Sequence, residues 1–125
     1  MIAGIGIDMI EVDRVAEKIA MSSGFREKVF SIQEIALCEA HGKNKAQHYA
    51  ARFAAKEAFL KATGLGLMLG YELSEIEVTI DESGKPSLLL KGNFEEQARR
   101  DQWKIVHLSL SHLSEVACAV VVIER

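Results

Sequence analysis

The sequence is poor in the residue types that mark disulfide-rich, disordered and nucleic-acid-binding chains. Its 125 residues include one proline and two cysteines, and the net charge is −3. Cys38 and Cys118 lie far apart and match neither a disulfide framework nor a zinc motif, so we expect small buried thiols in a reducing compartment. There is no low-complexity tract or long run of like charge, which argues against a disordered chain. The acidic balance does not suggest a large nucleic-acid-binding surface.

Long apolar runs are also missing, and no stretch approaches the length that crosses a bilayer. The apolar first residues carry Asp8 and Glu11 and lack a basic flank, unlike a secretory signal peptide. We therefore predict a soluble cytoplasmic protein with no membrane or nucleic-acid partner. The composition is 49% hydrophobic and 26% charged, which fits one globular domain over residues 1–125.

The first apolar segment contains a carboxylate where a buried strand is expected, in "GIGIDMIEV". Alternation over residues 2–10 places Asp8 on the same face as Gly4 and Gly6. The two glycines leave room for another element to approach the strand on that face. Because an unpaired buried carboxylate is unfavourable, Asp8 requires a compensating partner.

The strongest helical pattern is the alanine-rich "AQHYAARFAAKEAFLKAT" (46–63), which is followed by Gly64. One stripe at the helical period is apolar until Glu57 and continues to Lys61. Taken singly, Glu57 is interpreted as an ion-pair partner of Lys61, and Asp8 as a cap of the following turn. If the helix packs on the face that carries Asp8, however, the two carboxylates converge, and a shared magnesium ion would offset their repulsion.

Basic residues close to Glu57 fit a phosphate ligand. Lys61 follows one turn later, and Arg52 and Lys56 lie on an adjacent face, for which a solvated helix flank is the competing interpretation. The next loop, "GLGLMLG" (64–70), is glycine-rich and lets a bulky ligand approach the backbone. This loop is not a P-loop, and the histidines show no zinc spacing.

The remaining patterns predict a mainly antiparallel sheet. The expected elements are a helix over 14–21 capped by Asp13, a helix over 31–40 with a capping box of Ser31 and Glu34, a hairpin of 76–80 with 87–91, a helix from Asn93 to about 101, and strands over 103–112 and 115–124. The last strand is apolar on both faces, so we expect it to be central. The order indicates an α+β domain with a single antiparallel-rich sheet covered by helices on one side.

Together and in this order, the segments resemble the holo-acyl-carrier-protein synthase family of 4′-phosphopantetheinyl transferases. The matching stretches are "GIGIDMIEVDRV", "RFAAKEAFLKATGLG", "GKP" and "LSLSHLSEVACAVVVIE", which cover essentially the whole chain. The resemblance implies the fold of that superfamily and a homotrimer with active sites between subunits. It implies a magnesium-dependent transferase of lipid metabolism that moves phosphopantetheine from coenzyme A to a serine of apo-acyl carrier protein, releasing adenosine 3′,5′-bisphosphate. The carrier belongs to fatty acid biosynthesis or to polyketide synthesis.

The resemblance also implies roles for single residues. Carried over by motif, Asp8 and Glu57 are the magnesium ligands, and Lys61 completes the catalytic set. Lys61 and Gly64 match positions that contact coenzyme A, and His112 of "SLSH" matches a position near its nucleotide. The base that accepts the serine proton stays open between Asp8 and a metal-bound water.

Arg14 matches a basic position on the helix that meets the acidic carrier protein, and Lys18 lies one turn further on. Lys18 and Arg26 would extend this docking face, and for both an ordinary charged helix surface is a close alternative. Leu65 stands where the family often has threonine, so a hydrogen bond from that side chain to coenzyme A is absent.

Two alternatives belong to other classes of protein. The first is a non-catalytic, oligomeric α+β ligand-binding module in which Asp8 and Glu57 are members of structural ion pairs. The second is a magnesium-dependent nucleotide hydrolase, which would break down coenzyme A without a carrier protein.

Overall fold

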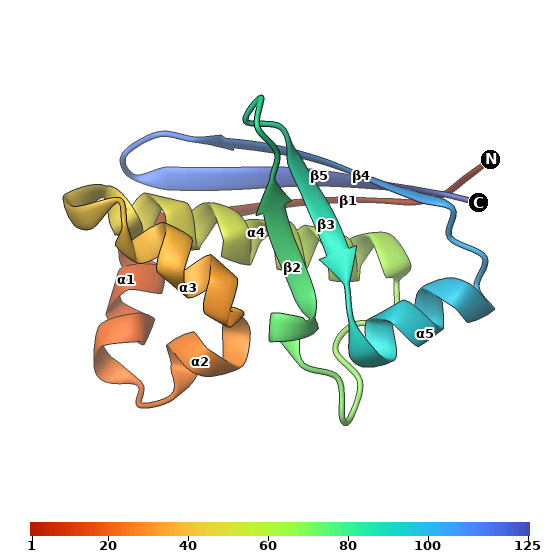
Figure 1. The fold of residues 1–125 in the computed structure, drawn as a ribbon, viewed down its shortest axis with the longest axis horizontal. Coiled ribbons are helices and arrows are strands. Elements are labelled where there is room, and N and C mark those ends of the chain that lie inside the picture. Colours follow the sequence, from red (N-terminus) through yellow and green to blue (C-terminus); the bar gives the residue numbers. More distant parts are fainter.

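One long helix, α4 (Lys45–Thr63), runs through the middle of the molecule, and the other elements pack around it (Figure 1). The computed structural model describes all residues 1–125. In chain order the other elements are β1 (Ile2–Glu11), α1 (Val12–Met21), α2 (Phe25–Val29), α3 (Ile32–Glu39), the 3-10 turn η1 (Gly42–Asn44), the 3-10 turn η2 (Leu73–Glu75), β2 (Ile76–Ile80), β3 (Pro86–Leu90), α5 (Gly92–Arg100), β4 (Ile105–His112) and β5 (Val116–Glu124). No helix combines the length and the apolar content that a bilayer crossing needs.

The main sheet has three antiparallel strands in the order β1-β5-β4, with α4 against one face. The predicted central position of the last strand is confirmed. Its alternate residues Ala117, Ala119, Val121 and Ile123 are buried, because they point towards α4 and the rest of the core.

The α+β class is confirmed, but the prediction of a single sheet is wrong. β2 and β3 form a separate two-stranded antiparallel sheet. In Figure 1 these two strands run across the direction of β1, β5 and β4. Because of this crossing, β3 contacts β4 without forming a hydrogen-bonded ladder with it. The strand patterns in the sequence identify the hairpin but not its orientation.

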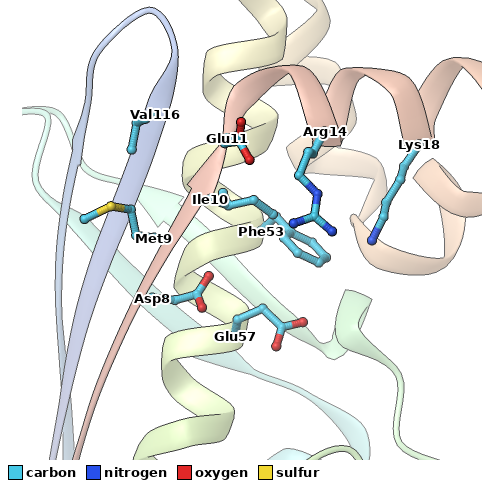
Figure 2. Close-up of a pocket in the computed structure, with 9 residues that line it drawn as sticks. All are labelled: Asp8, Met9, Ile10, Glu11, Arg14, Lys18, Phe53, Glu57 and Val116. Carbon is cyan, nitrogen blue, oxygen red and sulfur yellow. The ribbon is translucent and has the colours of Figure 1, made fainter.

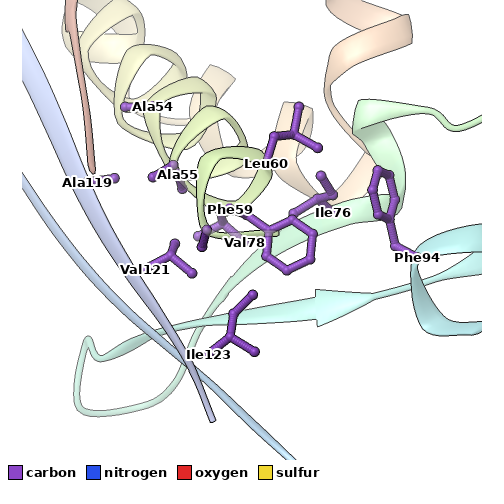
Figure 3. Packing of buried hydrophobic residues seen from close by; sticks show 12 residues of the cluster. Ala54, Ala55, Phe59, Leu60, Ile76, Val78, Phe94, Ala119, Val121 and Ile123 are labelled. Atoms are coloured by element: carbon purple, nitrogen blue, oxygen red, sulfur yellow. The ribbon is translucent and has the colours of Figure 1, made fainter. Parts of the chain in front are cut away.

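Two buried clusters lie on α4. The larger one joins α4 to β2, β5 and α5 (Figure 3), and the ring of Phe59 makes edge contacts with Phe94 and Trp103, both at 5.8 Å between centroids. The smaller cluster lies under α1, α2 and α3 and includes Val15 and Phe30. The helix is therefore buried on most of its circumference, as its small alanine side chains allow.

Arg52 and Lys56 do not lie on a solvated helix flank, because both residues are buried, so this interpretation of the sequence is wrong. The Nζ atom of Lys56 donates hydrogen bonds to Glu34 Oε1 at 2.8 Å and to the carbonyls of Leu73 and Ile76. Burial lowers the pKa of Lys56, and the Glu34 carboxylate opposes that shift. Lys56 thus links α3 and the start of β2 to α4, and it does not face a phosphate ligand.

Helix ends agree with the sequence at two places and differ at a third. The capping box of Ser31 and Glu34 is present, with both reciprocal hydrogen bonds. Gly64 ends α4 in the left-handed conformation at φ 73°. Asp13, however, is not a cap: β1 runs directly into α1, Glu11 occupies the cap position without a side-chain bond, and Asp13 falls in the first turn.

Two glycines bring β1 against the backbone of α4. A Cβ atom on Gly4 would lie 2.0 Å from the carbonyl oxygen of Ala62, and one on Gly6 would lie 2.0 Å from that of Ala58. No side chain fits at either position, because real Cβ atoms do not approach a carbonyl oxygen this closely. Since residues two apart share a strand face, this contact also fixes where Asp8 meets the helix.

We expect Gly6→Ala to lower the melting temperature strongly, because the added methyl group has to push β1 away from α4. The destabilisation should be about 1–3 kcal/mol, as for an overpacked core, measured by chemical denaturation. Ser87→Thr is the control, since it adds one methyl group to an exposed strand position on β3, away from this contact. Equal stability of the two variants would mean that β1 does not depend on this close approach.

Candidate active site

Asp8 on β1 and Glu57 on α4 line one cavity of about 460 Å³ (Figure 2). Asp8 is held in the β1–β5 ladder opposite Ala119, and Glu57 lies in the helix that the glycines of β1 approach. The structure therefore brings together the two carboxylates that the sequence singles out, from elements almost fifty residues apart in the chain.

The partner of Asp8 within the chain is Lys61. The Nζ atom of Lys61 lies 3.0 Å from Asp8 Oδ1 and also donates to the carbonyl of Ile7 at 3.0 Å. The Asp8 side chain is only 15% exposed, whereas that of Lys61 is 57% exposed. The Glu57–Lys61 ion pair that the helical spacing suggests is not formed, because Lys61 extends to the strand instead.

Glu57 forms no ion pair and no side-chain hydrogen bond in the chain. Its pKa is raised, first by burial and then by the negative charge of Asp8, while the ammonium groups of Lys61 and Lys18 act in the opposite direction. A half-buried carboxylate beside another one is unfavourable when ionised, so a cation between them would stabilise both.

The donor set at this point fits magnesium better than a softer metal. No group of three or more histidine, cysteine, aspartate or glutamate side chains converges anywhere in the chain. Zinc sites normally require three or four such ligands. Magnesium, by contrast, is commonly held by one or two carboxylates, with water and substrate phosphate completing the octahedron. Asp8 and Glu57 would hold it here.

Arg14 and Lys18 extend from α1 into the same cavity (Figure 2), and neither takes part in an ion pair. The Nζ atom of Lys18 lies 5.8 Å from the ring centroids of both Phe25 and Phe53. Phe53 is a lining residue that the sequence suggests only as core, although it precedes Glu57 by one helical turn on the same stripe. The carboxylates thus share one cavity with two cationic side chains that have no ion-pair partner in the chain.

A second cavity, of about 410 Å³, adjoins the first and shares Glu57 with it. Lys61, Gly64, Gly66 and Leu67 line this cavity. The glycine-rich loop after α4 therefore opens beside the carboxylates, as expected of a loop that admits a bulky ligand.

His112 does not lie with these residues in one chain. It lines a separate cavity of about 370 Å³ together with His48, Arg52 and Pro86. The His112 ring packs edge-on against that of His48 at 5.5 Å, and burial lowers the pKa of His48 to about 4. The Arg52 side chain is 4% exposed, and its Nε atom has no hydrogen-bond partner. The sequence assigns no role to His48, although this residue precedes Arg52 by one helical turn.

Comparison with known proteins identifies the family. The model of the 4′-phosphopantetheinyl transferase superfamily matches residues 4–121. A holo-[acyl-carrier-protein] synthase from Syntrophus aciditrophicus is 47% identical over 126 residues, which cover 99% of this chain and 97% of that protein.

Two solved structures are similar along their whole length. The holo-[acyl-carrier-protein] synthase of Neisseria meningitidis superposes with a TM-score of 0.90 at 29% identity, covering 100% of both chains. The enzyme of Bacillus anthracis, solved in complex with CoA (3′,5′-ADP), superposes with a TM-score of 0.82 at 38% identity and covers 99% of this chain and 97% of its own. The agreement of motifs, fold and full-length coverage leads to one conclusion: the chain belongs to the 4′-phosphopantetheinyl transferase superfamily.

Proposed function

We propose that this protein transfers the 4′-phosphopantetheine group of coenzyme A to a serine of apo-acyl carrier protein. The observation that carries the proposal is that Asp8 and Glu57 line one cavity together with Arg14 and Lys18, and that Lys61, which lines the adjoining cavity, pairs with Asp8. Relatives over the full length are named holo-[acyl-carrier-protein] synthase, and one solved structure of such an enzyme contains coenzyme A. A non-catalytic binding module would not need an unpaired, half-buried Glu57 beside Asp8, with an unpaired Arg14 in the same cavity.

Asp8 and Glu57 are the proposed magnesium ligands. When bound, magnesium supplies positive charge to the phosphate oxygens on which negative charge increases during phosphoryl transfer. The raised pKa of Glu57 supports this role, because Lys61 and Lys18 offset its unfavourable ionisation only in part and a bound cation would relieve it.

The other groups of the chain orient the reactants. Lys61 lines the second cavity and is suited to bind a phosphate oxygen there, and the left-handed turn at Gly64 leaves the loop backbone open to the donor. In the reaction, the serine oxygen forms a bond to the phosphorus next to pantetheine, and the bond from that phosphorus to adenosine 3′,5′-bisphosphate breaks. The serine proton passes to a base, for which Asp8 is the proposed carboxylate because it lines the cavity from β1.

Arg14 and Lys18 are the proposed docking residues for an acidic carrier protein. Both reach into the cavity of the carboxylates without a partner in this chain, so a carrier held there would present its serine to the reacting phosphorus. Electrostatic docking of this kind raises the association rate and weakens as salt is added.

We further propose a homotrimer. The face of β1 turned away from α4 presents Ile5, Ile7 and Met9, which are 69%, 60% and 69% exposed, beside Val120 and Val122 of β5. An apolar sheet face of this extent is typical of a contact surface. Its proposed occupant is another copy of this chain.

Assembly would also complete the active site. Arg52, with its unpartnered buried Nε atom, and His112 would bind the nucleotide phosphates of a coenzyme A whose pyrophosphate lies at Asp8 and Glu57 of a neighbouring copy. This arrangement explains why one chain holds the two groups of residues in separate cavities. The cytoplasm is the proposed compartment, which agrees with the free thiols of Cys38 and Cys118.

The central test combines coenzyme A, apo-carrier protein and magnesium, and measures the carrier by mass spectrometry. The wild-type protein should add one phosphopantetheine to the carrier, and Glu57→Gln should lower the magnesium-dependent rate by roughly 10²-fold or more. Glu96→Gln, on the exposed side of α5, is the matched control and should react as the wild type does. Breakdown of coenzyme A without any modified carrier would support the hydrolase instead.

The same variant should be more stable than the wild type when magnesium is left out. The pKa of Glu57 is higher in the folded chain than in the unfolded one, so stability falls as the pH rises through the window between those values. Above that window the penalty is complete, and Glu57→Gln removes it. The melting temperature at pH 8 should therefore rise in Glu57→Gln, and a decrease would mean that ionised Glu57 stabilises the fold.

For carrier docking, we expect Arg14→Glu to raise the Michaelis constant for the carrier protein by tenfold or so, since a charge that attracts the partner becomes one that repels it. The constant for coenzyme A should change little. Lys104→Glu, an equal charge reversal at an exposed position before β4, should change neither. Equal damage to both constants in Arg14→Glu would argue against docking.

For assembly, Ile7→Lys should convert a species of three chain masses into monomers in light scattering, because an ammonium group would be buried in the apolar contact. Activity should fall with the loss of the trimer. Leu89→Lys, at a half-exposed leucine of β3, is the control and should remain trimeric. A wild-type protein that is monomeric at micromolar concentration would contradict the proposal.

A further inference from the structure

We propose that Lys61 couples the binding of the divalent cation to the binding of coenzyme A. In the absence of coenzyme A, its ammonium group competes with the cation for Asp8. When coenzyme A binds, the ammonium group moves from Asp8 to a phosphate of the donor. This inference rests on the proposed function, in that it takes Asp8 and Glu57 as the cation ligands. It adds a second role for Lys61, exerted before the phosphate is in place.

The competition follows from the contacts of Asp8. Lys61 Nζ lies 3.0 Å from Asp8 Oδ1 and 3.0 Å from the carbonyl oxygen of Ile7. This ion pair is the only one that Asp8 forms in the chain. A divalent cation bound by Asp8 and Glu57 would lie beside the same carboxylate, and two cations at one carboxylate repel each other. One of them has to move.

The mobile partner is Lys61. Asp8 is fixed in the middle of β1 by its ladder with β5, and its side chain is 15% exposed. The Lys61 side chain is 57% exposed, and its ammonium group ends a flexible stem on the last turn of α4. No other carboxylate within the chain is paired with Lys61, so its alternative position has to be supplied by a ligand.

The second cavity provides that position. Lys61 lines it together with Gly64 and Gly66, and Glu57 lies on the wall that it shares with the first cavity. A phosphate bound there attracts the ammonium group away from Asp8 and frees the carboxylate for the cation. By linkage, each ligand then raises the affinity for the other by the same factor.

The test measures the affinity for Mn²⁺, used as a paramagnetic probe for the magnesium site, by electron paramagnetic resonance with and without coenzyme A. Without coenzyme A, Lys61→Met should bind Mn²⁺ at least about fivefold more tightly than the wild type, because no ammonium group competes. The increase in Mn²⁺ affinity that coenzyme A causes should be smaller in Lys61→Met than in the wild type, by the same factor of about five.

Lys18→Met is the matched control. It removes a cation that also acts on Glu57 but does not contact Asp8, so its Mn²⁺ affinity should change less than twofold. Lys61→Arg keeps a cation within reach of Asp8 and should restore weak Mn²⁺ binding. Circular dichroism confirms that each variant is folded before titration.

Two outcomes separate this inference from the function on which it rests. If wild type and Lys61→Met bind Mn²⁺ equally, or if Lys18→Met binds as tightly as Lys61→Met, Lys61 is not a specific competitor and the inference is wrong while the cation site stands. If the wild type binds no Mn²⁺ even with coenzyme A, or if Asp8→Asn binds Mn²⁺ as tightly as the wild type, the proposed cation site is itself wrong and the coupling falls with it.

Discussion

The contact between the first strand and the long helix is the constraint on which the site depends. Gly4 and Gly6 bring the backbone of β1 against the carbonyl groups of Ala58 and Ala62, closer than any side chain permits. This approach places a carboxylate of the strand opposite a carboxylate and an ammonium group of the helix. The same residues therefore serve packing and chemistry. The alanines of α4 contribute in the same way, since small side chains let the helix be surrounded by both sheets and by the three helices at one end.

Charge is arranged differently in the core and at the site. In the core, the Lys56 ammonium group is satisfied by Glu34 and two carbonyls, and both partners are fully buried, so the pair holds α3 and β2 to α4. At the site, Glu57 has no partner and its pKa is raised. Groups with such unfavourable ionisation concentrate at functional positions, because an incoming ligand gains from satisfying them. The neighbouring residues Lys56 and Glu57 thus differ in role: Lys56 stabilises the core, and Glu57 is available to a ligand.

The surface of a single chain has two features that the fold alone does not explain. One is the apolar face of β1 and β5, and the other is the separation of the carboxylate cavity from the cavity of His112 and Arg52. The proposed association of copies through the apolar face would account for both, since it would cover the exposed isoleucines and supply each carboxylate site with nucleotide contacts from a neighbour. The substrate would then bind across a boundary between chains, and folding, assembly and activity would be coupled.

The sequence by itself determined the types of the elements except α2, the ends of α4 and α3 and the central position of β5, and it singled out Asp8 and Glu57 as carboxylates in apolar segments. These features depend on local rules, namely side-chain periodicity, capping and the small size of glycine. The tertiary structure alone decided the split into two sheets, the burial of Arg52 and Lys56, the choice of Asp8 over Glu57 as partner of Lys61, and the distance of His112 from both. Each of these depends on how elements cross in space, and a pattern of residues along one helix or strand does not contain the direction from which the next element arrives.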